Sequence, residues 1–132
     1  MKKQVITIGK RDFEIGKRPY VMGILNVTPD SFSDGGKYGD LDAALKHTEE
    51  MIKEGADIID VGGESTRPGH VKISVAEEIE RTCFVIEAIK ERFEIPVSLD
   101  TYKYQVAQAG ILAGADLIND IWAVSYTHLT LP

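Results

Sequence analysis

The stretch DIIDVGGESTRPG, at residues 57–69, decides the fold class of this chain. Its first half is a nearly continuous apolar run, which is typical of a strand buried on both faces of a parallel sheet. Its second half is a loop of glycine, hydroxyl and charged residues, and in α/β folds the ligand-binding groups gather in the loops that follow such strands. The stretch therefore predicts a parallel α/β fold with a functional site directly after this strand.

Strand and helix patterns alternate along the rest of the chain. Four apolar runs predict buried strands, at 20–27, 57–62, 96–100 and 116–121. Helical spacing of apolar residues predicts helices at 40–54, 74–93 and 103–113, with Asp40 as an N-cap and with Ser74 and Glu77 as a capping box. Strands this apolar need cover on both faces, so the order predicts a parallel sheet covered by helices. A short β-hairpin is expected before it, within residues 1–18.

The sequence repeats itself once, since GADIID at 55–60 returns as GADLIN at 114–119, 59 residues further on. The repeat places Asp60 and Asn119 at equivalent strand ends, and Asp100 ends the strand between them. Three hydrogen-bonding side chains at the same edge of a parallel sheet would line a single ligand-binding opening. This favours a barrel over an open sheet, although alternation alone does not decide between them. The alternative is that these residues cap the helices that follow them.

Composition is that of an ordinary globular domain, with 132 residues, a formal charge of −6 and 43% hydrophobic residues. No lysine or arginine cluster forms a stripe, so we expect no nucleic-acid binding. No apolar run approaches the roughly 20 residues of a membrane span, and the N-terminus lacks the apolar core of a signal peptide. We therefore expect no membrane association and a cytoplasmic location. The single cysteine, Cys83, excludes an internal disulfide and is expected on the inward side of the second helix, with Val75, Ile79, Ile86 and Ile89.

The first loop, NVTPDSFSDGG at 26–36, carries oxygen ligands. Asn26, Asp30 and Asp34 could offer carbonyl and carboxylate oxygens to Mg²⁺, which prefers such ligands and keeps several waters. The same residue types are common in turns, so this loop alone is a weak indication of a metal site. Phe32 is an aromatic residue among polar neighbours, and it either folds back onto the core or closes over a ligand.

The second loop and the later strand ends offer groups for an anion and for a flat heterocycle. Ser65, Thr66 and Arg67 provide hydroxyl and guanidinium donors after two glycines, although a solvated loop with a surface arginine is the alternative. The carboxylate of Asp100 can accept two parallel N–H bonds, and the amide of Asn119 can donate and accept together. These two side chains suit an amino-pyrimidine edge.

Three blocks of sequence together resemble the dihydropteroate synthase family of the folate pathway. They are MGILNVTPDSFSDGG at 22–36, DIIDVGGESTRPG at 57–69, and PVSLDTYK with the later LINDI within 96–121. The blocks occur in the family's order and span roughly residues 20–122. The resemblance implies a (β/α)8 TIM barrel of pterin-binding type. It also implies a transferase that condenses 6-hydroxymethyl-7,8-dihydropterin diphosphate with 4-aminobenzoate to 7,8-dihydropteroate, with diphosphate departing with the help of Mg²⁺.

The resemblance also implies roles for individual residues. Asn26 would bind the metal and the diphosphate, and Thr66 and Arg67 would serve the diphosphate, which makes these three the expected catalytic residues. The residues that would hold the pterin are Asp60, Asp100 and Asn119. The residues that would form the 4-aminobenzoate pocket, which is also the sulfonamide site in this family, are Pro29, Phe32 and Ser65. The full-length family member is expected to be a homodimer.

The chain is shorter than the resemblance requires. A barrel of this type takes about 250 residues, whereas the first three βα units and a fourth strand are expected here, at 19–123. The family's later lysine and Arg-x-His motifs have no counterpart, and residues 124–132 look like a non-native tail. Half of a barrel would leave two open sheet edges and bare apolar faces. We therefore expect the chain alone to aggregate, dimerise or order only in part, and to lack synthase activity.

Two other functions fit parts of the same pattern. A non-catalytic pterin-binding module, or a barrel that presents methyltetrahydrofolate to a corrinoid methyltransferase, would share the pterin-holding acids. Such a protein would not be expected to keep both of the loops described above. A fragment without any ligand would differ from the synthase only in where its gene ends. The presence of both loops favours the synthase.

Overall fold

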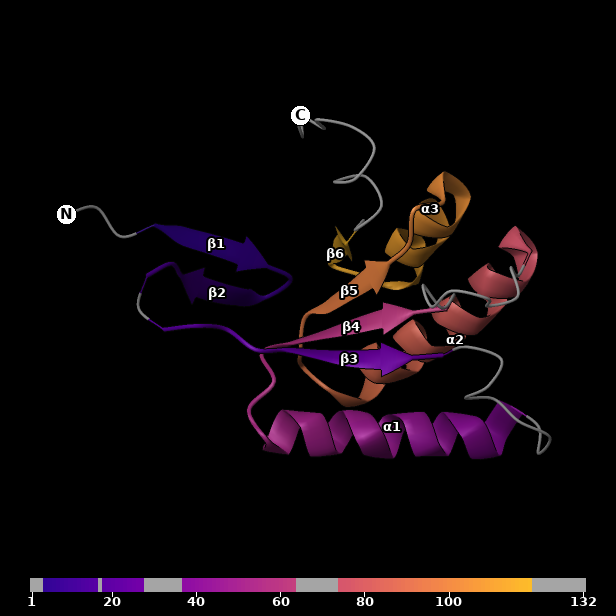
Figure 1. Ribbon diagram of the computed structural model, residues 1–132, viewed down its shortest axis with the longest axis horizontal. Helices are drawn as coiled ribbons and strands as arrows, with labels where there is room; N and C mark the ends of the chain where they lie inside the picture. The colour runs from indigo at the N-terminus through magenta and orange to yellow at the C-terminus, as the bar shows by residue number, and fades with distance from the viewer. Residues whose placement is uncertain (1–3, 17, 28–36, 64–73, 120–132) are drawn as a thin grey trace, which may run out of the picture.

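The computed structural model describes residues 4–16, 18–27, 37–63 and 74–119, with the side chains of 37–40 excepted. These ranges form a small hairpin followed by a parallel sheet with helices (Figure 1). The hairpin strands are β1 (Val5–Ile8) and β2 (Arg11–Glu14). The sheet strands are β3 (Met22–Asn26), β4 (Ile58–Gly62), β5 (Val97–Asp100) and β6 (Leu117–Asn119). The helices are α1 (Lys37–Lys53), α2 (Val75–Arg92) and α3 (Tyr104–Ala113).

The sheet strands lie in chain order, β3-β4-β5-β6, and every neighbouring pair is parallel. A helix connects each strand to the next; α1 and α2 pack on the sheet and α3 packs on α2 (Figure 1). The core lies between the sheet and these helices. Its fully buried side chains include Ile59, Val61, Val85, Ile86, Ile89, Val97, Leu99 and Val106. The predicted order of a hairpin followed by parallel β and α units is therefore confirmed.

The helix boundaries follow the expected signals with two differences. Ser74 is the N-cap of α2, and its side chain accepts a hydrogen bond of 3.1 Å from the backbone N–H of Glu77. The Glu77 carboxylate pairs with Arg81 on the next turn, so only half of the predicted capping box forms. Helix α1 begins at Lys37 and not at Asp40. Asp40 thus falls inside the helix and is not its N-cap.

Helix α2 buries Ile86 and Ile89 as predicted, whereas Val75, Ile79 and Cys83, which were also expected inward, are only half-buried. It also buries Glu78, Thr82 and Val85, which were not expected inward. The hydrophobic pattern alone did not reveal this, because two of the buried residues are polar. Among the described residues no helix is long and apolar enough to cross a membrane.

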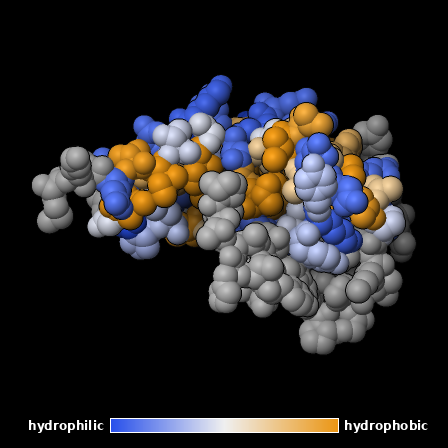
Figure 2. Space-filling model, turned by 90° about the horizontal axis from the view of Figure 1, so that it is seen from above, coloured by the Kyte–Doolittle hydropathy of each residue, from blue (hydrophilic) through white to orange (hydrophobic). Residues whose placement is uncertain are grey.

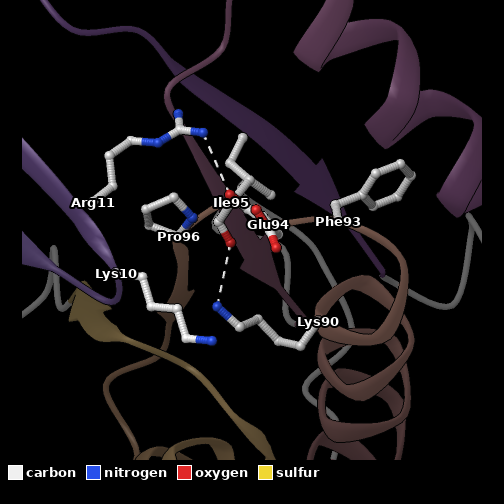
Figure 3. A pocket seen from close by; sticks show the side chains of 7 residues that line it. All are labelled: Lys10, Arg11, Lys90, Phe93, Glu94, Ile95 and Pro96. Carbon is white, nitrogen blue, oxygen red and sulfur yellow. Dashed lines mark hydrogen bonds between the residues drawn. The ribbon is translucent and has the colours of Figure 1, made fainter.

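The hairpin lies across the amino ends of the sheet strands. Arg11 donates to the backbone carbonyl of Asp57 at 3.5 Å. It also donates to the backbone carbonyl of Glu94 at 3.3 Å (Figure 3). Gly9, at the turn, has a φ of +63°, and a Cβ there would come within 2.8 Å of an Asp116 carboxylate oxygen. The turn therefore requires glycine for two separate reasons, its positive φ and its close approach to Asp116. The outer surface of the hairpin carries apolar side chains, at the left of Figure 2.

The sheet face opposite the helices is partly open to solvent. Met22 and Ile24 of β3 are 38% and 59% exposed, and Leu117 of β6 is 39% exposed. The two strands form the edges of the described sheet, so their side chains on this face have neighbours on one side only. The prediction that the first strand is buried on both faces is therefore wrong for β3, where burial alternates along the strand.

Candidate active site at the carboxyl ends of the strands

Three of the predicted site residues lie in one row across the sheet. The register pairs Asn26 of β3 with Gly62 of β4, Gly62 with Asp100 of β5, and Asp100 with Asn119 of β6. Each is the last residue of its strand, and in-register neighbours in a sheet project to the same face. The row therefore brings an amide, a carboxylate and a second amide together at the carboxyl edge of the inner face, the face opposite the helices.

Gly62 leaves room in the middle of this row. A Cβ placed there would lie 3.7 Å from Oδ2 of Asp100 and 3.9 Å from Oδ1 of Asn26. Those are ordinary van der Waals distances, so any larger side chain at this position would fill the space between the two oxygens. The glycine thus forms the floor of a small polar cradle between Asn26 and Asp100.

Asp60 lies one row deeper on the same face. It pairs in register with Ile24 and Ser98, and it is only 2% exposed. Its Oδ1 accepts a hydrogen bond of 2.5 Å from Ser98 Oγ, and its carboxylate is also hydrogen-bonded to the Asn119 side chain. Burial raises the pKa of Asp60, and the two hydrogen bonds partly oppose that shift.

The depth of Asp60 corrects one expectation. The repeated GAD motif predicted that Asp60 and Asn119 occupy equivalent strand ends. However, β4 continues for two residues beyond Asp60, and it is Gly62 that shares a register row with Asp100 and Asn119. Neighbouring strands are staggered, so equal sequence distance from the start of a strand does not give equal height. Asp60 still reaches the Asn119 side chain from below.

Sequence reasoning missed the side chains that support this row. Ser98 is fully buried and donates a hydrogen bond to Asp60. Because side chains alternate along a strand, Ser98 could have been placed on the same face of the sheet as Asp100 from the sequence alone. Glu78 is 1% exposed, and its Oε2 accepts from Thr101 Oγ1 at 3.2 Å. An acid inside an amphipathic helix gives no sequence signal that distinguishes it from a surface acid, so Glu78 was not predictable.

The other predicted site residues lie outside the described residues. These are the expected aminobenzoate residues Pro29, Phe32 and Ser65 and the expected diphosphate residues Thr66 and Arg67. The tail at 124–132 also lies outside them. Whether these residues lie near the row of Asn26, Asp100 and Asn119 therefore stays a prediction.

The cradle offers suitable donors for a hard cation. Oxygen atoms of one amide and one carboxylate flank Gly62, and Mg²⁺ is commonly held by one or two carboxylates while waters and substrate phosphates complete its shell. Among the described residues no group of three or more His, Cys, Asp or Glu could hold a metal ion. Asn26 and Asp100 thus fit a partly hydrated cation that is shared with a ligand.

A separate hollow of about 250 Å³ lies at the opposite end of the sheet, between the hairpin turn and the segment before β5 (Figure 3). Two of its cations are already engaged: Lys90 pairs with Asp116 at 2.8 Å, and Arg11 binds backbone carbonyls. Ligands of α/β folds bind at the carboxyl ends of parallel strands. The row of Asn26, Asp100 and Asn119 is therefore the better candidate site.

Comparisons with known proteins agree with the sheet and with the sequence blocks. A family model described as pterin binding enzyme matches residues 22–131. A dihydropteroate synthase of Clostridium beijerinckii is 66% identical over 115 residues, which is 87% of this chain and 43% of the relative. One of Bacillus subtilis is 54% identical over 123 residues, 93% of this chain and 43% of the relative.

Solved structures give the same result. Xanthomonas albilineans dihydropteroate synthase with 4-aminobenzoic acid superposes with a TM-score of 0.81 at 45% identity, covering 92% of this chain and 45% of that one. The Yersinia pestis enzyme with a sulfonamide drug has a TM-score of 0.80 at 48% identity, covering 94% and 45%. The predicted fold class, the first part of a (β/α)8 barrel, is confirmed by these neighbours. This chain spans less than half the length of the relatives that it matches, and over that span it belongs to the pterin-binding enzyme family.

Proposed function

We propose that this chain supplies the amino-terminal part of the active site of a dihydropteroate synthase. The reaction joins 6-hydroxymethyl-7,8-dihydropterin diphosphate to 4-aminobenzoate, giving 7,8-dihydropteroate and diphosphate. The observation that carries the proposal is the row of Asn26, Asp100 and Asn119 with Asp60 beneath it, on one face of a sheet that matches this family. The high identity to relatives named dihydropteroate synthase supports the synthase over the other pterin-binding proteins.

The pterin is the natural ligand for the acids of the row. Its amino-pyrimidine edge presents parallel N–H donors, and the Asp100 carboxylate can accept two of them. The Asn119 amide can donate and accept at the neighbouring position. Asp60 is buried and held by Ser98, so it would present a fixed oxygen from below and not a mobile one. Fixed acceptors in a site from which water is excluded bind and orient a ligand at little further cost.

The diphosphate would lie toward β3. Asn26 stands at the end of β3, across Gly62 from Asp100, and we assign it to the diphosphate and to Mg²⁺. When bound, Mg²⁺ would neutralise charge on the departing diphosphate. Thr66 and Arg67 are proposed to contribute hydroxyl and guanidinium donors to the same group.

The second substrate needs a pocket and not a base. An aniline nitrogen is already nucleophilic, so positioning should supply most of the rate. We assign that pocket to Pro29, Phe32 and Ser65. The cytoplasmic location and the homodimer of the longer protein stay predictions from the sequence.

The proposal is tested by titrating the 132-residue chain with 6-hydroxymethylpterin and following ligand fluorescence. Asp100→Ala should weaken binding by about tenfold or more, because it removes charge-assisted hydrogen bonds. Asp42→Ala is the matched control, since Asp42 is an exposed acid of α1 and is not part of the row. Equal binding by the parent chain and Asp100→Ala would contradict the assignment of the pterin to this row.

A second titration separates the synthase from a simple pterin-binding module. The pterin diphosphate should bind more tightly with Mg²⁺ present than without it, and Asn26→Ala should remove that difference. A module that binds only the pterin ring would show no effect of Mg²⁺ in either chain.

A further inference from the structure

A buried carboxylate lies behind the row of site residues. Glu78 is in the first turn of α2 and is 1% exposed. Removing an ionised carboxylate from water is costly unless other groups compensate for the lost hydration. An apolar side chain of similar size would be the more stabilising choice at such a position. The contacts of Glu78 should therefore indicate what a carboxylate does there.

The first contacts are with the turn that follows β5. Thr101 Oγ1 donates to Oε2 of Glu78 at 3.2 Å, and the Lys103 ammonium lies 2.9 Å from Oε1 as an ion pair. The turn is also tied internally, because the backbone N–H of Lys103 donates to Thr101 Oγ1 at 3.1 Å. This turn begins directly after Asp100, so Glu78 holds the residues that carry the proposed pterin ligand.

The next contacts are with the chain that leaves β4. A Cβ added at Gly63 would come within 3.0 Å of Glu78 Cγ and within 2.7 Å of a Thr82 methyl carbon. Helix α2 therefore packs directly on the residue after Gly62. A third strand is connected through Thr101, whose backbone N–H donates to the carbonyl of Asn119 at 3.1 Å.

We propose that Glu78 is a positioning residue of the candidate site. Its carboxylate fastens the turn after β5 to helix α2, which itself packs on Gly63 after β4, and through Thr101 it sets the position of Asp100 relative to Asn119. The assignment rests on the proposed function, because the row that Glu78 supports is the proposed pterin site. Glu78 itself is not assigned to the pterin.

The test compares three variants of the 132-residue chain: Glu78→Gln, Glu87→Gln, and the double variant Glu78→Gln with Lys103→Met. Glu87 is an exposed acid of the same helix and is the matched control. The double variant leaves no unpaired lysine, so its stability should be closer to that of the parent chain. Two quantities are measured: amide hydrogen exchange at Thr101, and the dissociation constant for 6-hydroxymethylpterin.

We expect exchange at Thr101 to be about tenfold faster, and pterin binding about tenfold weaker, in both chains that carry Glu78→Gln. Glu87→Gln should change neither quantity. Parent-like exchange in Glu78→Gln, or recovery of pterin affinity along with stability in the double variant, would overturn the positioning role. If the parent chain binds no pterin, the proposed function of the chain fails, and the exchange rates still decide whether Glu78 fixes the row.

Discussion

Replacing Ile24 and Ile59 separately by alanine should distinguish the two faces of the sheet. Ile24 lies on the inner face of β3 and is 59% exposed, whereas Ile59, on the neighbouring strand, points to the helices and is fully buried. The two residues have the same side chain and neighbouring positions in one sheet. Their substitutions therefore differ mainly in burial.

The expected magnitudes follow from that difference. Ile59→Ala removes buried methyl groups and leaves a cavity in a packed core, which costs about 2–5 kcal/mol. Ile24 keeps only about two fifths of its surface covered, and full burial of an isoleucine contributes about 1.5–3 kcal/mol, so Ile24→Ala should cost about 1 kcal/mol or less. No cavity forms at a site open to water. The variants should thus differ by roughly 2 kcal/mol, about thirtyfold in the unfolding equilibrium constant.

Urea denaturation of the three chains, followed by circular dichroism at several protein concentrations, measures this difference. The midpoint should fall strongly for Ile59→Ala and only slightly for Ile24→Ala, with similar slopes. A loss for Ile24→Ala as large as that for Ile59→Ala would refute the reasoning, since it would mean that the inner face is covered in solution. Concentration dependence of that loss would identify a second copy of the chain as the cover.

Three further predictions concern single interactions. Asp60→Asn should raise the free energy of unfolding at pH 7 by about 1 kcal/mol. Burial raises the Asp60 pKa, so the charged carboxylate destabilises the folded chain at neutral pH. The stability gained by Asp60→Asn should therefore shrink as pH falls through that raised pKa. A destabilised variant at neutral pH would contradict this. Arg18→Gln should destabilise the chain at neutral pH, because the Arg18 hydrogen bond lowers the Asp57 pKa. That contribution is present above the unfolded pKa of about 4 and is lost as pH falls through the lower folded value, so acid titration of both chains should converge at low pH. Gly110→Ala should lose about 1 kcal/mol in urea denaturation despite the better helix propensity of alanine, since its Cβ would overlap the side chain of the buried Leu99. A more stable variant would contradict this packing.

The elements of the fold were largely predictable from local signals. Apolar runs ending at polar residues located β4 and β5, and Ser74 located the start of α2. These signals work because strand burial and helix capping depend on residues close in sequence. The start of α1 was missed because its first turn needs no unusual residue.

The site was predictable only in its strand-end residues. Asp100 was found because it ends an apolar run and Asn119 because the GAD motif repeats, and the register does pair them. The stagger that lowers Asp60 depends on how strands align with one another, which no single strand encodes. Glu78 was missed because its burial is decided by contacts with Gly63 and Thr101, far away in the sequence.

The exposed apolar side chains and the polar row share one face, and this links stability to ligand binding. Ile24 and Leu117 lie in the same register row as Asp60 and Ser98, directly beneath the row of Asn26 and Asn119. Whatever covers the isoleucine and the leucine also removes water from Asn26 and Asn119, which are still partly exposed. Lower local dielectric strengthens hydrogen bonds to a ligand and makes an unpaired acid more costly. A cover on the inner face should therefore stabilise the sheet, raise the Asp60 pKa further and tighten the binding of a ligand that donates hydrogen bonds, all through the same loss of solvent.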